Sequence, residues 1–448
     1  MDPDLLVEEV RLTPILIADP PLLNTQGVHQ PFTPRLVVEV ATRGGGTGLG
    51  ETYGDGRYLD LARPLAEALP GRAVTDVNGL FVLAARVCGD SRAVDERVDE
   101  RVDAGGLRGV QTAAKLRLSV VSAFEVAYLD ALGKSLGLPV HALLGGRVRD
   151  SVEYSAYLFH KVAGADGWGR ALDPAGVVEQ ARRFDRTYGF RSFKLKGGVF
   201  PPEQEIAAIR ALAEEFPGRP LRLDPNGAWS VETALEVARE LKGVLEYLED
   251  PTTGTGTMAE VASRTDVPLA TNMCVTTFEE IPEAFARDAV RIVLCDHHYW
   301  GGLHRTRELA ALCRTYGVGL SMHSNTHLGI SLAAMTQVAA TLPDLDHACD
   351  THYPWQTEDV VTIRPVFRDG RLAVSDAPGL GVELDREALA ALHRRWLEDD
   401  GTHRDRDDAA ALRRLRAAGG LGDGVADVLA DGPADGPAGG LGDGLRGV

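Results

Sequence analysis

The run Phe193-Lys-Leu-Lys196 is a short strand-like segment that ends on a lysine, and it sets the pattern for the middle of the chain. Five later runs have the same form, with apolar residues followed by one polar side chain: 221–224, 245–249, 269–272, 292–296 and 319–323. Their ends are separated by about 23 to 28 residues, which is the length of a strand, a helix and two loops in a (β/α)8 barrel. The spacing therefore predicts an α/β fold whose polar strand ends surround one mouth.

Two further strand patterns, at 152–158 and 347–350, bring the number to eight. Helical patterns alternate with them, as in the stretch after Pro201-Pro202, where Ile206, Ile209 and Leu212 recur near the 3.6-residue period. Strands that alternate with helices favour a parallel sheet. We predict that residues 136–358 form this barrel and that its sheet closes.

The flanking regions have a different pattern. Residues 35–42 and 48–52 read as an antiparallel hairpin around Gly44-Gly45-Gly46-Thr47, and helical patterns follow from 60 to 145. We therefore predict an α+β domain over residues 1–135. After the barrel we expect strands at 360–363 and 371–374 and a helix at 386–397, whereas 416–448 is rich in Gly, Ala, Asp and Pro and predicts a low-complexity, disordered tail.

Bulk composition excludes several classes of protein. The 448 residues carry 65 Asp and Glu against 47 Lys and Arg, for a formal charge of -18, which argues against a nucleic-acid or acidic-membrane partner. The N-terminus shows no secretory signal, and no apolar run approaches the roughly 20 residues of a membrane span. The five cysteines contain no CxxC pair, which is typical of reduced thiols. We expect a cytoplasmic protein.

Three oxygen-bearing side chains, Asp224, Glu249 and Asn272, end three consecutive strands. Hard oxygen ligands with two negative charges suit Mg²⁺ and leave positions open for an anionic substrate. Each residue alone also fits a turn or helix cap, as in Asp224-Pro-Asn-Gly. Because three such residues occur on adjacent strands, we predict a Mg²⁺ site.

Two kinds of base flank the predicted metal. Asp296 and His323 end successive strands, and a carboxylate beside an imidazole makes a general base near neutral pH. Lys194 and Lys196 share one strand face, because side chains alternate with a period of two. We therefore expect proton abstraction next to a carboxylate, with His323 and Lys196 on opposite sides of the mouth. The alternative is a divalent-metal hydrolase, since His323-Ser-Asn-Thr-His327 spaces two histidines four apart, but this string lacks the Glu of the HExxH motif.

Longer strings identify a family resemblance. Phe193-Lys-Leu-Lys-Gly-Gly198, Asp224-Pro-Asn-Gly-Ala-Trp-Ser230, Ala270-Thr-Asn-Met273, His323-Ser-Asn325 and Asp350-Thr-His352 resemble the glucarate dehydratase branch of the enolase superfamily, over roughly residues 8 to 412. Enzymes of that superfamily use Lys or His bases with Mg²⁺ to stabilise an ene-diolate. The resemblance implies a (β/α)7β barrel with an α+β capping domain that segments from about 360–415 complete.

The resemblance also implies a reaction and a set of site residues. The reaction is dehydration of D-glucarate to 5-dehydro-4-deoxy-D-glucarate, in which His323, tuned by Asp296, removes the α-proton. Lys196 serves the epimeric substrate, and Lys194 helps stabilise the ene-diolate. Asn325 joins the catalytic group. The implied substrate contacts are His29, Thr112, Tyr157, Asn226, His352 and Arg406.

Two departures affect the substrate's far end. The segment after Glu249-Asp-Pro251 is shorter than in better-known members and lacks their Gly-Phe-Ser-Gly-Arg-like string, and Arg404 competes with Arg406 for one role. Galactarate, idarate or another acid sugar stays open as substrate, as does a racemase or dehydratase of another hydroxy acid. The resemblance favours a homo-oligomer.

Overall fold

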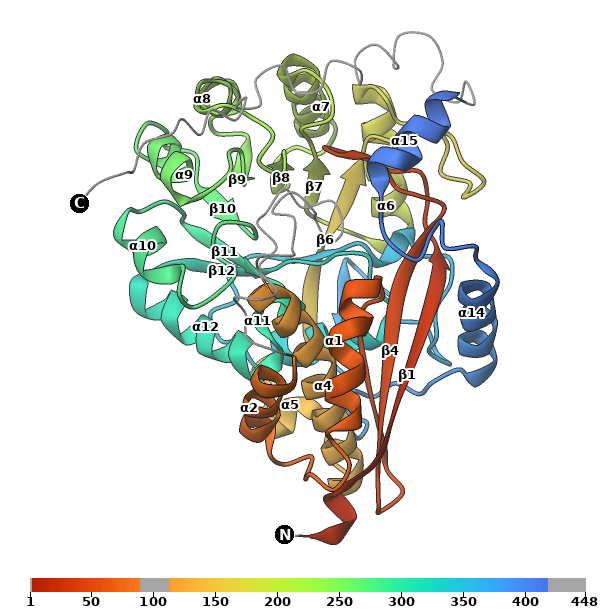
Figure 1. Cartoon of the computed structure of the whole chain (residues 1–448). Helices are drawn as coiled ribbons and strands as arrows, with labels where there is room; N and C mark the ends of the chain where they lie inside the picture. Colours follow the sequence, from red (N-terminus) through yellow and green to blue (C-terminus); the bar gives the residue numbers. More distant parts are fainter. Residues whose placement is uncertain (1, 89–112, 418–448) are drawn as a thin grey trace, which may run out of the picture.

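The computed structural model describes residues 2–88 and 113–417. Its larger part is a nearly closed barrel of eight parallel strands with helices around it (Figure 1). Along the sheet the order is β12-β11-β10-β9-β8-β7-β6-β13. The strands are β6 (Ser151–Phe159), β7 (Phe193–Lys196), β8 (Leu221–Asp224), β9 (Leu245–Glu249), β10 (Leu269–Thr271), β11 (Ile292–Cys295), β12 (Gly319–Met322) and β13 (Cys349–Thr351).

The two ends of this sheet meet. Asp346 N donates to Leu320 O at 3.2 Å, and Ser321 Oγ donates to Ala348 O at 2.9 Å. Helices connect each strand to the next: α6 (Pro174–Tyr188), α7 (Pro202–Glu215), α8 (Val231–Glu240), α9 (Thr255–Ala262), α10 (Ile281–Ala286), α11 (His297–Trp300), α12 (Leu303–Tyr316) and α13 (Gly329–Ala339). After β13 the chain makes only the short 3-10 helix η2 (Tyr353–Trp355). The predicted (β/α)7β barrel is therefore confirmed.

Local sequence explains where these helices begin and what they bury. Pro202 occupies the first turn of α7, where a missing N–H costs nothing, and Ile206, Ile209 and Leu212 are buried as the helical period predicts. Ser230 caps α8, because its Oγ accepts a hydrogen bond from Thr233 N at 3.1 Å.

The N-terminal part is an α+β unit on one side of the barrel (Figure 1). Its antiparallel sheet has the order β1-β4-β5. The elements are η1 (Pro3–Leu5), β1 (Val7–Ala18), β2 (Leu23–Asn24), β3 (Gly27–Val28), β4 (Phe32–Thr42), β5 (Thr47–Tyr53), α1 (Gly56–Glu67), α2 (Val77–Val87), α4 (Ala113–Leu136) and α5 (Val140–Leu143). Glycine lets β5 approach α4 closely, since a Cβ at Gly50 would lie 1.9 Å from Ala123 O. The predicted hairpin and capping domain are confirmed.

Segments after the barrel return to both parts. The strand β14 (Arg371–Ala373) pairs with β6, and α14 (Arg386–Glu398) packs on β1. The last described helix, α15 (Asp408–Ala417), packs on β3. The predicted tail lies, from residue 418 on, outside the described residues.

One predicted strand is wrong. Residues 360–363 do not form a strand but make a single bridge between Val361 and Leu384, because no neighbouring strand among the described residues is available to extend the ladder. The domain limits at 135, 358 and 416 stay predictions. The five cysteines are buried free thiols, and no helix within 2–88 and 113–417 is long and apolar enough to cross a membrane.

Candidate active site

The polar strand ends gather at one rim of the barrel, because the strands are parallel and their carboxyl ends point the same way. Each predicted residue of this series lies at or directly after its strand and is buried: Lys194, Lys196, Asp224, Glu249, Asn272, Asp296 and His323. The spacing along the sequence therefore predicted their places on the fold correctly.

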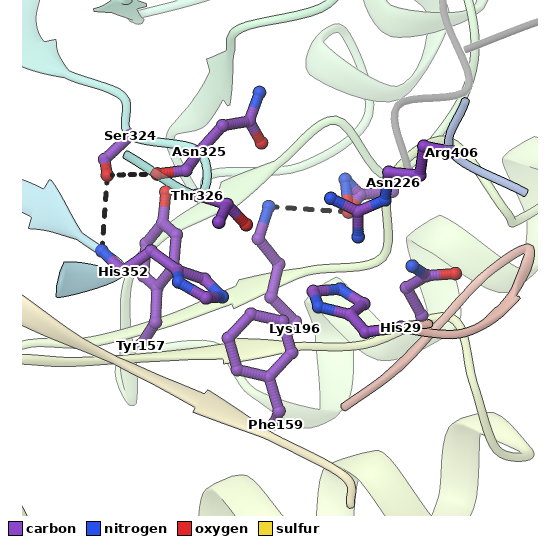
Figure 2. A pocket seen from close by; sticks show the side chains of 11 residues that line it. His29, Tyr157, Phe159, Lys196, Asn226, Ser324, Asn325, Thr326, His352 and Arg406 are labelled. Carbon is purple, nitrogen blue, oxygen red and sulfur yellow. Dashed lines mark hydrogen bonds between the residues drawn. The ribbon is translucent and has the colours of Figure 1, made fainter. Parts of the chain in front are cut away.

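Lys196 occupies the end of β7 and points across to β8. Its Nζ donates to Asp224 Oδ2 at 2.5 Å. It also donates to Asn226 Oδ1 at 3.4 Å, as Figure 2 shows. Tyr157 from β6 lies beneath, with its ring centre 5.3 Å from the Lys196 ammonium and 4.6 Å from that of Lys194. Both lysines thus share one face of β7, as the strand period predicts.

Lys194 lies deeper and is held by two carboxylates. Its Nζ donates to Glu249 Oε2 at 2.7 Å and to Asp350 Oδ2 at 2.5 Å. Burial alone would lower the pKa of Lys194, but Asp350 and Glu249 raise it above its ordinary value. Arg222 also donates to Asp350 Oδ1 at 3.2 Å. Lys194 is therefore a fixed positive charge rather than a free base.

The predicted metal ligands fit a small oxygen-seeking cation. Glu249 Oε1 and Asn272 Oδ1 are buried and have no hydrogen-bond partner among the described residues. Burial and the charge of Asp224 raise the pKa of Glu249 well above its usual range. Burial also opposes ionisation of Asp224, but Lys196 and Lys194 lower its pKa. Unpaired buried oxygens are costly, and a divalent cation among these three side chains would satisfy them.

Asp250 holds the backbone at Asn272 in place through hydrogen bonds. Its Oδ2 accepts a hydrogen bond from Asn272 N at 2.8 Å, and its Oδ1 accepts one from Thr271 Oγ1 at 2.5 Å. Asp250 has a positive φ of 37°, an uncommon conformation for a residue with a side chain. The bend turns its carboxylate back onto β10, which fixes where the Asn272 side chain begins.

The predicted base His323 is paired with the carboxylate of Asp296. Asp296 Oδ2 lies 3.2 Å from His323 Nδ1, and His323 Nε2 has no hydrogen-bond partner in the part of the chain described. Burial lowers the pKa of His323 even though Asp296 opposes this, so the ring is neutral near pH 7. The other oxygen of Asp296 accepts from His298 Nδ1 at 2.8 Å and His298 N at 2.9 Å. His298 was not predicted.

A pocket opens beside Lys196, and most predicted substrate contacts line it (Figure 2). The lining contains the predicted His29, Tyr157, Lys196, Asn226, Asn325, His352 and Arg406, together with Asn24, Phe159, Ser324 and Thr326. Thr112 lies outside the described residues. Asn325 Nδ2 donates to Tyr53 Oη at 2.7 Å, which ties this pocket to the capping domain.

The C-terminal segment brings Arg406 over the pocket. Its side chain is buried and donates to Asp408, with Nη2 3.0 Å from Oδ2. Asp408 Oδ2 also accepts a hydrogen bond from Asn24 Nδ2 at 2.7 Å. Arg404 instead donates to the carbonyls of Trp396, Leu397 and Asp399. Of the two competing arginines, Arg406 is the one that faces the pocket.

Comparison with known proteins agrees with this geometry. The model "Mandelate racemase / muconate lactonizing enzyme, N-terminal domain" matches residues 12–145, and "Enolase C-terminal domain-like" matches residues 176–388. The "Probable glucarate dehydratase" of Streptomyces coelicolor is 72% identical over 421 residues, which cover 92% of this chain and 97% of the relative.

Solved structures give the same result. An enolase from Thermobispora bispora, complexed with magnesium and formate, is 53% identical with a TM-score of 0.87, over 92% of this chain and 98% of that one. An enolase from Mycobacterium smegmatis, complexed with tartrate, is 52% identical with a TM-score of 0.86, over 92% and 96%. The chain belongs to the enolase superfamily and, within it, to the glucarate dehydratase family.

Proposed function

We propose that this protein is a Mg²⁺-dependent acid-sugar dehydratase that converts D-glucarate to 5-dehydro-4-deoxy-D-glucarate. The observation that carries the proposal is that His323 Nε2, unpaired among the described residues, shares with Lys196 a rim that also holds three oxygen ligands. The 72% identity to a probable glucarate dehydratase supports the substrate class.

His323 and Asp296 can account for the proton transfers of the proposed reaction. His323 Nε2 takes the proton from the carbon next to the substrate carboxylate, and the bonding electrons move toward that carboxylate. Asp296 stabilises the resulting imidazolium through Nδ1. The imidazolium then returns the proton to the departing β-hydroxyl, which leaves as water. The remaining enol becomes the 2-keto acid by proton transfer at carbon.

Charge stabilisation falls to the groups around Lys194. Its ammonium is fully buried and fixed, so it can face a developing oxyanion without reorganisation. Asp224, Glu249 and Asn272 would hold Mg²⁺, which when bound supplies positive charge for the substrate carboxylate and its enolic form. The Tyr157 ring lies against both ammonium groups.

The residues that line the pocket support a substrate with a second carboxylate. We assign the second carboxylate to the part of the pocket wall that His29, His352 and Arg406 form, because all three can donate to an anion. The structure from Mycobacterium smegmatis is complexed with tartrate, itself a hydroxy diacid. We infer a hexarate that spans from the metal rim to this wall.

The test is turnover of a panel of hexarates by the Mg²⁺-loaded protein, with the 2-keto product followed by semicarbazide absorbance and NMR. D-glucarate is expected to react, and a folded protein that leaves it unchanged would refute the substrate assignment. His323→Asn is expected to abolish α-proton exchange with D-glucarate, whereas Lys196→Met abolishes exchange with the C5 epimer, L-idarate. Lys242→Met, a change at an exposed lysine paired with Asp266, serves as the matched control.

The hydrolase alternative predicts the opposite metal preference. His327 approaches Ser324 Oγ at 3.3 Å and shares no metal-like cluster with His323 among residues 2–88 and 113–417. Restoration of activity to a chelator-treated sample by Zn²⁺ and not Mg²⁺ would favour hydrolysis. A cytoplasmic location and a homo-oligomeric state stay predictions.

A further inference from the structure

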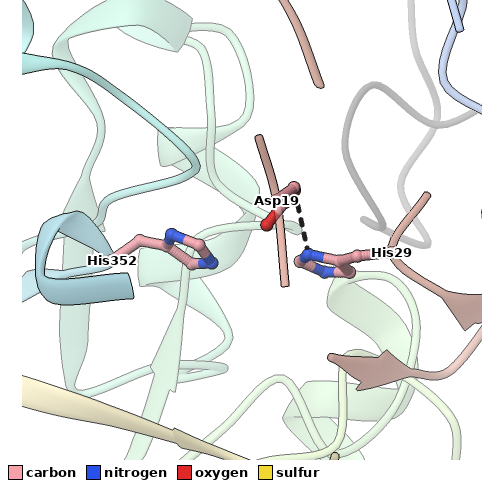
Figure 3. Close-up of side chains that lie close together, drawn as sticks. All are labelled: Asp19, His29 and His352. Atoms are coloured by element: carbon pink, nitrogen blue, oxygen red, sulfur yellow. Dashed lines mark ion pairs between the residues drawn. The ribbon is translucent and has the colours of Figure 1, made fainter. Parts of the chain in front are cut away.

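A buried carboxylate lies directly behind the substrate wall. Asp19 follows β1, and its side chain is fully buried. Its Oδ2 lies 3.2 Å from His29 Nδ1 and accepts a hydrogen bond from Thr33 Oγ1 at 2.5 Å (Figure 3). Its other oxygen, Oδ1, has no hydrogen-bond partner among the described residues. The catalytic steps described above leave this carboxylate without a role.

His29 lines two cavities. One is the substrate pocket of Figure 2, and the other has a volume of about 430 Å³. Asp19 lines the second cavity and is absent from the lining of the substrate pocket. Asp19 is therefore placed to act on a substrate through His29. It qualifies as a positioning residue and not as a contact residue.

The charge states of Arg406 and His352 show why a further well-placed donor matters on the substrate wall. Arg406 is already paired with Asp408 at 3.0 Å. His352 is neutral near pH 7, since burial lowers its pKa to about 3, and its Nδ1 lies 3.1 Å from Gln356 Nε2. Neither residue offers an uncompensated positive charge to an incoming anion. His29 stacks on His352 with 5.9 Å between ring centres, so its ring position is also fixed.

Asp19 is placed to orient the His29 ring. Burial alone would raise the pKa of the Asp19 carboxyl, but His29, His352 and Arg406 hold it well below its usual range. A carboxylate beside an imidazole orients the ring and sets which of its nitrogens carries the proton. His29 Nδ1 has its Asp19 contact at 3.2 Å and no hydrogen-bond partner among the described residues, which leaves the other ring nitrogen for a substrate in the pocket that His29 lines.

We propose that Asp19 positions His29 as the hydrogen-bond donor for the substrate's second carboxylate, and that this pair makes the pocket prefer dicarboxylates over monocarboxylates. The inference deepens the proposed function and rests on it for the substrate class. Asp19 belongs to the capping domain and would influence substrate specificity without lining the substrate pocket.

Binding measured without turnover gives the sharpest test. Isothermal titration with L-tartrate, a dicarboxylate, and with glycerate, its monocarboxylate counterpart, is run on the Mg²⁺-loaded full chain. Asp19→Asn keeps the shape and can still accept from Thr33, but it removes the charge. We expect it to weaken tartrate about 10- to 100-fold, the range for a hydrogen bond to a charged group, while glycerate changes less than about threefold.

The matched control is Asp166→Asn. Asp166 lines the same outer cavity and is nearly buried, but it pairs with Lys161 at 2.8 Å and not with His29. This variant is expected to keep the tartrate-to-glycerate ratio of the wild type. Asp19→Ala serves as a second variant, and thermal unfolding shows that each sample is folded. His29→Gln should reproduce the loss, and adding Asp19→Asn to it should cost little more.

Three results would overturn the inference. Equal weakening of tartrate and glycerate by Asp19→Asn would assign Asp19 a structural role only. Unchanged or tighter tartrate binding would mean that its charge repels the ligand. Wild-type protein that does not favour tartrate over glycerate would remove the preference itself. Turnover is scored separately: if D-glucarate is not converted but the tartrate preference depends on Asp19, the proposed reaction fails and the positioning role stands.

Discussion

Replacing Asp296 with asparagine is expected to disable His323 while leaving the protein folded. Asp296 Oδ1 receives two donors from His298, its ring Nδ1 at 2.8 Å and its backbone N at 2.9 Å. The asparagine oxygen must therefore stay on that side. Its NH₂ group then faces His323 Nδ1, which lies 3.2 Å from the present Oδ2. His323 can only accept from this group, so its proton moves to Nε2, the atom that must be bare to act as a base.

The size of the effect follows from two losses. A hydrogen bond to a charged group is worth about 1.5–3 kcal/mol. The imidazolium formed during the reaction also loses a facing carboxylate, worth about 4 kcal/mol at the dielectric constant of roughly 20 suited to such sites. Together these losses correspond to a fall in kcat of roughly 10⁴- to 10⁵-fold for D-glucarate.

The assay is steady-state formation of the 2-keto product at saturating Mg²⁺, across the pH range in which the variant is folded. Deuterium exchange at the carbon of L-idarate that faces Lys196 provides an internal control, because that exchange does not use Asp296 and is expected to persist. A kcat within tenfold of the wild type would refute the tautomer shift. So would a variant that loses both exchange reactions equally while its thermal midpoint stays unchanged.

Three other outcomes are expected. Glu51→Gln should destabilise the protein by about 3–5 kcal/mol in denaturant titrations, because the buried Glu51 accepts from Arg35 Nε at 2.9 Å and from two backbone amides of the barrel; a change below about 1 kcal/mol would contradict this. Mg²⁺ at 100 times its Kd should add about 2.7 kcal/mol to the free energy of unfolding, and Asn272→Leu should shrink the shift of thermal midpoint at equal Mg²⁺. Burial lowers the pKa of His160 from 6.5 to about 4, so stability should fall as pH drops from 6.5 towards 4, by up to about 3 kcal/mol. His160→Phe should flatten that pH dependence, and an unchanged slope would show that other groups cause it.

The barrel rim could be predicted from the sequence because each of its residues ends a separate strand. Lys196, Asp224 and Glu249 follow the strand–helix period, and a parallel sheet places all such ends together. The position of each residue is thus a local property repeated along the chain. Their contacts with one another needed no further information than the order of the strands.

Other parts of the site depend on contacts that no local pattern reports. Asp350 meets Lys194 only because ring closure places β13 beside β6. His298 lies two residues after Asp296, where an aspartate-capped helix is the ordinary interpretation, and its ring contact appears only in three dimensions. Asp19 lies in a short loop whose sequence gives no sign that His29 folds against it.

The predicted strand at 360–363 is wrong because a strand also depends on contacts that the local sequence does not report. Its β-branched residues favour an extended backbone, and the chain there is extended enough for one bridge at Val361. A strand also needs a neighbour, and within residues 2–88 and 113–417 this segment pairs only with the loop around Leu384. The local preference for an extended backbone was predicted correctly, but strand pairing depends on residues far away in the sequence.

The wall of the pocket joins the two ends of the chain, and this has a consequence for the order of folding. Asn24 and Asp408 form a hydrogen bond although 384 positions separate them, while the proposed bases and metal ligands come from one continuous stretch of barrel. Contacts between such distant residues carry a large loop-closure cost and form late. A newly made chain should therefore form the proposed catalytic rim before the proposed substrate wall. Selectivity would then be the last property gained on folding and the first lost if α15 were detached.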